Sequence, residues 1–100
     1  MPRPVALITG ASAGIGEELA RLFAARGYDL VLAARRADRL TALASELTDC
    51  TVTCIPVDLA KGKGPQLLIE GVSEHGLHVD VLVNNAGVIS TEPMLEADGD

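Results

Sequence analysis

The residues best suited to chemistry form a glycine-rich turn, in which Gly10, Gly14 and Gly16 follow Thr9. Gly10 would allow a tight exit from a strand, and Gly14 would leave no side chain to block a phosphate. Gly16 would let the next helix pack closely on the sheet. The free N–H groups at the start of that helix would then face the anion. The turn is therefore predicted to bind a dinucleotide, with a purely structural tight turn as the alternative.

Two arginines, Arg35 and Arg36, stand about 20 residues further along, where a dinucleotide fold distinguishes NAD from NADP. An acid there would bind the 2′-hydroxyl of NAD and repel the 2′-phosphate of NADP, but Ala34 occupies that place. A guanidinium binds phosphate through its planar fork and can stack on adenine. The pair predicts NADP, and two solvated surface arginines are the alternative.

Two more polar stretches follow apolar runs. Asp58 could accept a hydrogen bond from the adenine amino group while Leu59 packs on the ring, although Asp58 suits a helix N-cap equally well. The asparagines of residues 84–87 (NNAG) could tie neighbouring strand ends together. The alanine and glycine after them would let a ribose approach the backbone. A plain turn remains the alternative for this stretch.

Apolar runs rich in β-formers must position these turns, and they predict strands at residues 5–8, 30–33, 51–55 and 81–83. Helical patterns separate the strands, which implies a parallel sheet covered on both faces. With right-handed crossovers the fold is α/β, a doubly wound Rossmann-like sheet of strand order 3-2-1-4. All the polar turns then lie at the carboxyl ends of the strands, around one crevice.

Periodicity also predicts which helical side chains face the sheet. Those side chains are Ile15, Leu19, Leu22 and Phe23 in the first helix, Leu40, Leu43, Ala44 and Leu47 in the second, and Leu67, Leu68 and Val72 in the third. Asp38 is the predicted N-cap of the second helix. Gly71 is expected to weaken the middle of the third helix, whose start is delayed by Gly62, Gly64 and Pro65.

Composition narrows the class of protein. The chain of 100 residues is 48% apolar and 22% charged, which indicates a packed globule. Its net charge of −6 argues against a nucleic-acid surface, and no apolar stretch is long enough to span a membrane. Cys50 and Cys54 are predicted to be reduced thiols, because the sequence shows no secretory signs. The pair could mark a metal site, but no further Cys and no nearby His completes a ligand set. We expect a cytoplasmic protein without a metal.

These motifs, in this order, resemble the short-chain dehydrogenase/reductase family over essentially the whole chain. The resemblance implies that residues 1–100 are the N-terminal dinucleotide-binding part of a single Rossmann domain. The family transfers hydride between a nicotinamide and a small-molecule carbonyl or alcohol. The implied cofactor-binding residues are Gly10, Ser12, Ala13, Gly14, Ile15, Gly16, Arg35, Arg36, Asp58, Leu59, Asn85, Ala86 and Gly87.

The family's catalytic Ser and Tyr-x-x-x-Lys set has no counterpart here. The only tyrosine, Tyr28, has no lysine four residues later, so no catalytic residue is assigned. The favoured interpretation is the N-terminal half of an NADP-dependent oxidoreductase. A nucleotide-binding or interaction module without chemistry is the second. A methyltransferase using S-adenosylmethionine is the third, but the acid it needs after the second strand is missing.

The strand at residues 81–83 would lie at the edge of this sheet. No charged side chain between Asp80 and Glu92 discourages pairing with another molecule there. We therefore expect residues 1–100 to be marginally folded and to associate through this strand, which is compatible with a homo-oligomer.

Overall fold

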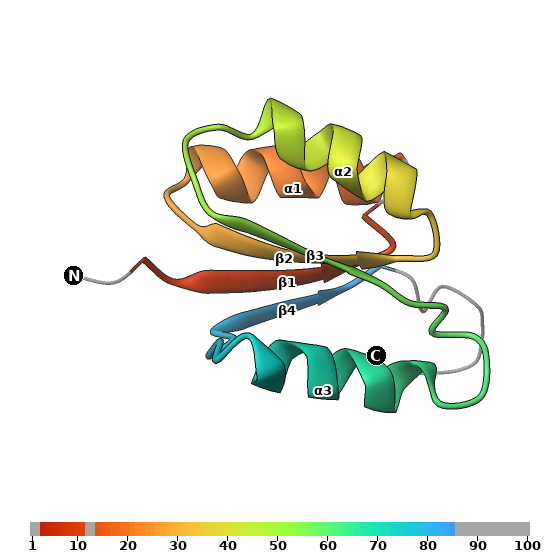
Figure 1. Cartoon of the computed structure of the whole chain (residues 1–100). Coiled ribbons are helices and arrows are strands. Elements are labelled where there is room, and N and C mark those ends of the chain that lie inside the picture. The colour runs from red at the N-terminus through yellow and green to blue at the C-terminus, as the bar shows by residue number, and fades with distance from the viewer. Residues whose placement is uncertain (1–2, 12–13, 86–100) are drawn as a thin grey trace.

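Four parallel strands form one sheet in the computed structural model, which describes residues 3–11 and 14–85. The strands are β1 (Val5–Thr9), β2 (Asp29–Ala34), β3 (Val52–Pro56) and β4 (Val81–Asn84). Their order is β3-β2-β1-β4 (Figure 1), which confirms the predicted fold class and strand order. The register places Leu7 of β1 opposite Val31 of β2 and Leu82 of β4.

Three helices cover the sheet. The helices α1 (Ile15–Ala25) and α2 (Ala37–Glu46) lie on one face, and α3 (Gly64–Glu74) lies on the other (Figure 1). Neighbouring residues of each strand point to opposite faces, so each strand contributes to two cores. Ala6 and Ile8 pack with the buried side chains of α1 and α2, whereas Leu7 packs with Leu68 of α3.

The face of α1 that packs on the sheet differs from the predicted one. Ile15 is 70% exposed and Leu22 is 47% exposed, so both were wrongly assigned to the buried face. Leu19 and Phe23 do pack on the core, but the fully buried positions of the helix are Gly16 and Ala20. The helix therefore turns its smallest side chains toward the sheet, which a count of large apolar residues cannot detect.

The same error occurs in α3, where Leu67 is 53% exposed. Leu68 is buried and Val72 packs against it, as predicted. Gly71 does not interrupt the helix. A Cβ there would lie only 3.1 Å from the side chain of Ile55. The glycine allows α3 to lie close to β3.

The predicted N-cap of α2 is also wrong. The helix begins at Ala37, Arg36 occupies the N-cap position, and no side chain caps the helix. Asp38 lies inside the first turn, where its carboxylate binds the guanidinium of Arg36. An acidic side chain in the first turn still complements the helix dipole.

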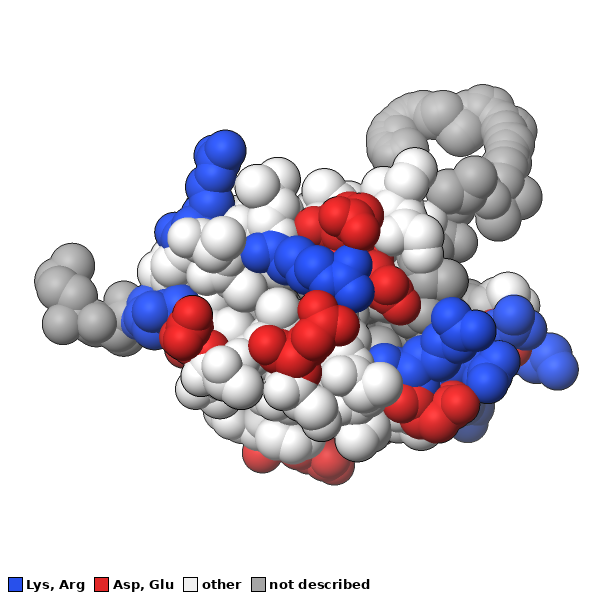
Figure 2. Space-filling view, turned by 90° about the horizontal axis from the view of Figure 1, so that it is seen from above, with Lys and Arg blue, Asp and Glu red and all other residues white. Residues whose placement is uncertain are grey.

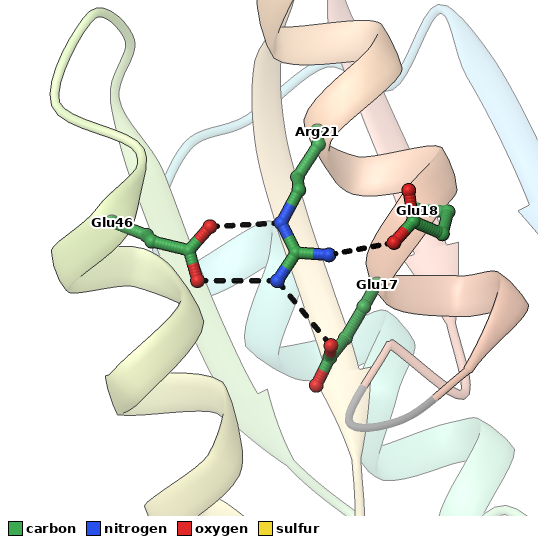
Figure 3. Close-up of polar contacts among 4 residues, drawn as sticks. All are labelled: Glu17, Glu18, Arg21 and Glu46. Carbon is green, nitrogen blue, oxygen red and sulfur yellow. Dashed lines mark hydrogen bonds and ion pairs between the residues drawn. The ribbon is translucent and has the colours of Figure 1, made fainter.

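Arg21 joins the two helices on the same face (Figure 3). Its Nε and Nη2 donate to the two carboxylate oxygens of Glu46 at 2.8 and 3.1 Å. Its Nη1 donates to Glu18 at 2.9 Å and Nη2 to Glu17 at 3.4 Å. The hydrogen bond to Glu46 is the main cause that raises the pKa of Arg21 and lowers the pKa of Glu46. We call these four residues the Arg21 cluster.

Strand β4 lies at one edge of the sheet and pairs with β1. Val81 and Val83 pack against the α1/α2 core, but Leu82 is 62% exposed on the other face. The location of the strand agrees with the sequence analysis. Association through this edge remains a prediction.

Candidate dinucleotide-binding site

Hydrogen bonds join the carboxyl ends of the strands. The backbone N–H of Gly10 donates to the carbonyl of Ala33 at 2.8 Å, and the N–H of Val57 donates to the carbonyl of Ala34 at 2.8 Å. The side-chain amide of Asn85 donates to the carbonyl of Gly10 at 3.2 Å. The turns after β1, β2, β3 and β4 thus lie together at the carboxyl ends of the strands. The predicted asparagine hydrogen bond between strand ends is present.

The glycine turn between β1 and α1 depends on backbone geometry that favours glycine. Gly10 has φ of 68° and Gly14, the N-cap of α1, has φ of 57°. A Cβ on Gly14 would meet no atom within 4 Å, so the space beside it is open. A Cβ on Gly16 would collide with the carbonyl group of Gly10. Gly16 therefore allows the close packing predicted for it.

The turn before α3 repeats this packing. A Cβ on Gly64 would collide with the carbonyl group of Asp58, as one on Gly16 would with that of Gly10. Gly64 therefore holds the start of α3 close to the end of β3. This role of Gly64 was not predicted, although Gly64 follows Asp58 at the same spacing as Gly16 follows Gly10.

A cleft of about 1010 Å³ opens at the carboxyl ends of the strands and continues along the sheet face beside α3. Four predicted cofactor-binding residues line it, namely Gly10, Arg35, Asp58 and Leu59. Three polar residues that the prediction omitted, Thr9, Lys61 and Asn84, line it as well. The structure thus places residues from the ends of β1, β2 and β3 around one space.

The other predicted cofactor-binding residues either do not line this cleft or lie outside the described chain. Gly14 and Ile15 line a shallow hollow of about 630 Å³ at the first turn of α1, beside Glu17 and Glu18. Gly16 is buried below that turn, and Asn85 binds the Gly10 carbonyl. The predictions for Ser12, Ala13, Ala86 and Gly87 fall outside the described residues.

Asp58 does not cap a helix. Its Oδ1 accepts the backbone N–H of Ala60 at 2.9 Å, which closes a local turn. Helix α3 begins only at Gly64, with Lys63 at the N-cap position. The N-cap alternative is therefore excluded, and the carboxylate remains beside the cleft.

Basic side chains cluster near the carboxyl ends of the strands, although the whole chain has a net charge of −6. Five of the eight Lys and Arg residues follow β2 or β3 and are exposed: Arg35, Arg36, Arg39, Lys61 and Lys63. Figure 2 shows their largest cluster at the end of the molecule that carries the strand ends. Because Lys61 follows Asp58 by three residues, the sequence could have identified it as a residue lining the cleft. The local field suits an anionic ligand.

The two arginines after β2 have different surroundings. Arg35 lines the cleft, and its side chain has no hydrogen bond or ion pair with residues 3–11 or 14–85. Arg36 donates from Nε and Nη2 to the carboxylate of Asp38 at 3.1 and 3.0 Å. This pairing raises the pKa of Arg36 and lowers the pKa of Asp38.

Other reactive side chains lie away from the cleft. Tyr28 packs edge-to-face on Phe23, with ring centroids 4.9 Å apart, against the α1/α2 core. Cys50 and Cys54 are free thiols whose pKa is raised by burial. Among the described residues, no group of three or more His, Cys, Asp or Glu could hold a metal ion. No described helix is both long and apolar enough to cross a membrane.

A parallel α/β sheet with a glycine turn at the end of β1 defines a dinucleotide-binding class of fold. The family model described as short chain dehydrogenase matches residues 4–100, and the chain belongs to this family.

Several known proteins are similar to the chain. "Probable NADP-dependent dehydrogenase in aabA 3′region" of Dichelobacter nodosus is 43% identical over 84 residues, covering 84% of this chain and 78% of that protein. Sulfoacetaldehyde reductase 2 of Chromohalobacter salexigens is 40% identical over 96 residues, covering 94% and 38%. The structure of L-sorbose reductase from Gluconobacter frateurii, complexed with NADPH and L-sorbose, has a TM-score of 0.81 at 40% identity, covering 96% and 38%. The chain thus spans less than half the length of the last two proteins.

Proposed function

We propose that this chain is the NADP(H)-binding part of an oxidoreductase that transfers hydride between a nicotinamide and a small carbonyl or alcohol substrate. The observation that carries the proposal is the cleft that Gly10, Arg35 and Asp58 share at three strand ends. The relatives support the choice of cofactor, since the L-sorbose reductase structure contains NADPH.

The residues present fit such a cofactor. The open space beside Gly14 suits a pyrophosphate, as do the N–H groups of the first turn of α1, which no described side chain caps. Arg35, lining the cleft without a partner in the described chain, suits a 2′-phosphate. Asp58 and Leu59 would contact the adenine. When bound, the cofactor supplies or accepts the hydride.

The remaining assigned residues complete this half of the site. Ser12, Ala13, Ile15 and Gly16 belong with the phosphate turn. Arg36 is assigned to bind the 2′-phosphate, and residues 85–87 (Asn85, Ala86 and Gly87) are assigned to contact the ribose. In each case the role is that of binding or orienting the cofactor.

Catalysis requires residues that these 100 do not supply. The family's Tyr-x-x-x-Lys motif does not occur in the sequence, and Tyr28 packs in the core. We therefore propose that residues 1–100 alone bind NADPH and reduce no carbonyl substrate. The same observation favours a second candidate, a nucleotide-binding module without chemistry. A cytoplasmic location is proposed for either.

Titration calorimetry with NADPH and NADH tests the proposal. NADPH should bind at least about tenfold more tightly, because a charge-assisted hydrogen bond contributes about 1.5–3 kcal/mol. Equal affinities would contradict the choice of NADP, and no binding would contradict the dinucleotide site. Oxidation of NADPH by residues 1–100 with a carbonyl substrate would show that a catalytic acid was overlooked.

A further inference from the structure

The start of α2 carries a carboxylate within the arginine-rich segment assigned to the 2′-phosphate. Asp38 binds Arg36 through two hydrogen bonds of 3.0 and 3.1 Å. Both side chains are well exposed, at 58% for Arg36 and 68% for Asp38. The pair thus lies at the surface, where an incoming ligand can reach it.

The pairing occupies part of the hydrogen-bonding capacity of Arg36. A guanidinium has five N–H donors, and here Nε and Nη2 both point to the Asp38 carboxylate. A phosphate that approaches Arg36 must share these donors or use the remaining ones. It also approaches a negative charge, because ion pairing keeps the pKa of Asp38 below its ordinary value.

Arg35 provides the contrast. It lines the cleft and has no side-chain partner within the described ranges. Two adjacent arginines therefore offer unequal positive charge to a ligand. The difference is caused by one carboxylate two residues after Arg36.

We propose that Asp38 is a specificity-determining residue that limits the preference for NADPH over NADH by competing with the 2′-phosphate for Arg36. This inference rests on the proposed function, since it assumes that NADP(H) binds at the carboxyl ends of the strands. A carboxylate close to a 2′-phosphate repels it, whereas the 2′-hydroxyl of NADH carries no charge. Removing the charge of Asp38 should therefore change NADPH affinity more than NADH affinity.

The test compares wild type, Asp38→Asn and the control Asp49→Asn by titration calorimetry with both cofactors. Asn keeps the shape of Asp38 and removes its charge. Asp49 is an exposed aspartate after α2, so its variant has the same net charge without an altered Arg36. We expect Asp38→Asn to raise the ratio of NADPH to NADH affinity about twofold to fivefold, the range of an exposed ion pair. Asp49→Asn should leave the ratio unchanged.

A double-mutant cycle separates competition for Arg36 from general repulsion. In the Arg36→Met background, Asp38→Asn should raise the ratio less than it does in the wild type. An equal rise in both backgrounds would contradict competition for Arg36. A fall in the ratio for Asp38→Asn would instead show that the carboxylate orients Arg36 for the phosphate, which overturns the inference.

The wild-type titrations distinguish this inference from the proposed function. If wild type prefers NADPH but Asp38→Asn has the same ratio, only the role of Asp38 is wrong. If wild type binds the two cofactors equally or binds neither, the proposed cofactor fails and the inference fails with it.

Discussion

The two regions at the strand ends that we propose to bind phosphate groups differ in what they consist of. The glycine turn after β1 consists of backbone, with Gly16 packed below the carbonyl of Gly10. The arginine segment after β2 consists of exposed side chains, one of them paired with Asp38. A substitution in the glycine turn must displace the backbone, whereas a substitution in the arginine segment changes the charge of a single side chain.

This difference predicts two kinds of response to mutation. Changes in the glycine turn should remove binding of every dinucleotide, because the pyrophosphate is common to all of them. Changes in the arginine segment should alter only the discrimination between NADPH and NADH.

The largest effect is expected for Gly16→Ala. The new Cβ would collide with the backbone of Gly10, which cannot move without disturbing β1, so unfolding should require about 3 kcal/mol less free energy. Chemical denaturation measures this loss. Gly71→Ala is the comparison: its Cβ would lie 3.1 Å from the flexible side chain of Ile55 rather than against backbone, so a smaller loss of stability is expected. Equal stability of both variants would show that the contact below Gly10 is unimportant.

Gly14→Val should abolish binding of both cofactors while the far-ultraviolet circular dichroism stays largely native. The branched side chain would fill the open space beside α1, and positive φ adds strain of about 1–3 kcal/mol. Gly76→Val is matched, because Gly76 has φ of 65° and open space but follows the C-terminal end of α3. Binding that survives in Gly14→Val, or is lost equally in Gly76→Val, would mean that the turn has no specific role.

Arg35→Asp should reverse the cofactor preference, because it removes an attraction for the 2′-phosphate and adds a repulsion. The ratio of NADPH to NADH affinity from calorimetry should fall from at least about tenfold to below one. Arg26→Asp makes the same charge change at the C-terminal end of α1 and should leave the ratio unaltered. A similar fall in both variants would indicate a general effect of net charge rather than a contact.

The smallest effect concerns the Arg21 cluster, which joins the helices whose first turns carry the two regions. The pKa of Glu46 lies below its ordinary value of 4.5 in the folded state. Its contribution to stability is therefore present above that value and is lost as the pH falls through the lower, folded-state pKa. Glu46→Gln should thus lose less stability than wild type on acidification below pH 4.5. Identical acid profiles for wild type and Glu46→Gln would show that the cluster contributes nothing, and the exposed Glu70→Gln of α3 serves as control.

Most of the fold could be predicted from the sequence, because strands rich in β-formers alternate with helical segments and end in polar turns. The buried face of α1 could be predicted only in part: the close packing of Gly16 was predicted, but Ala20 was missed, and Ile15 and Leu22 are exposed. The packing of Gly64 against Asp58 was missed because that glycine was interpreted only as a weak helix former. The ion pair of Arg36 with Asp38 was also missed, because the sequence indicated an N-cap at that position.

Association through β4 also remains to be tested. A cooperative thermal transition from a monodisperse monomer would contradict the expectation that the chain is marginally folded and pairs through this edge. Concentration-dependent sedimentation that Leu82→Lys reduces would support it, because Leu82 is exposed on the edge strand.

Nuclear magnetic resonance titration of ¹⁵N-labelled protein with NADPH and NADH tests the central claim most directly. Both cofactors should shift the amide signals of Gly10, Gly14 and Asp58, which lie at the strand ends and the start of α1. The difference between the two titrations should be concentrated at Arg35 and Arg36. Signal shifts at the amino ends of the strands, or identical shifts for both cofactors at the two arginines, would contradict a dinucleotide site that selects NADP.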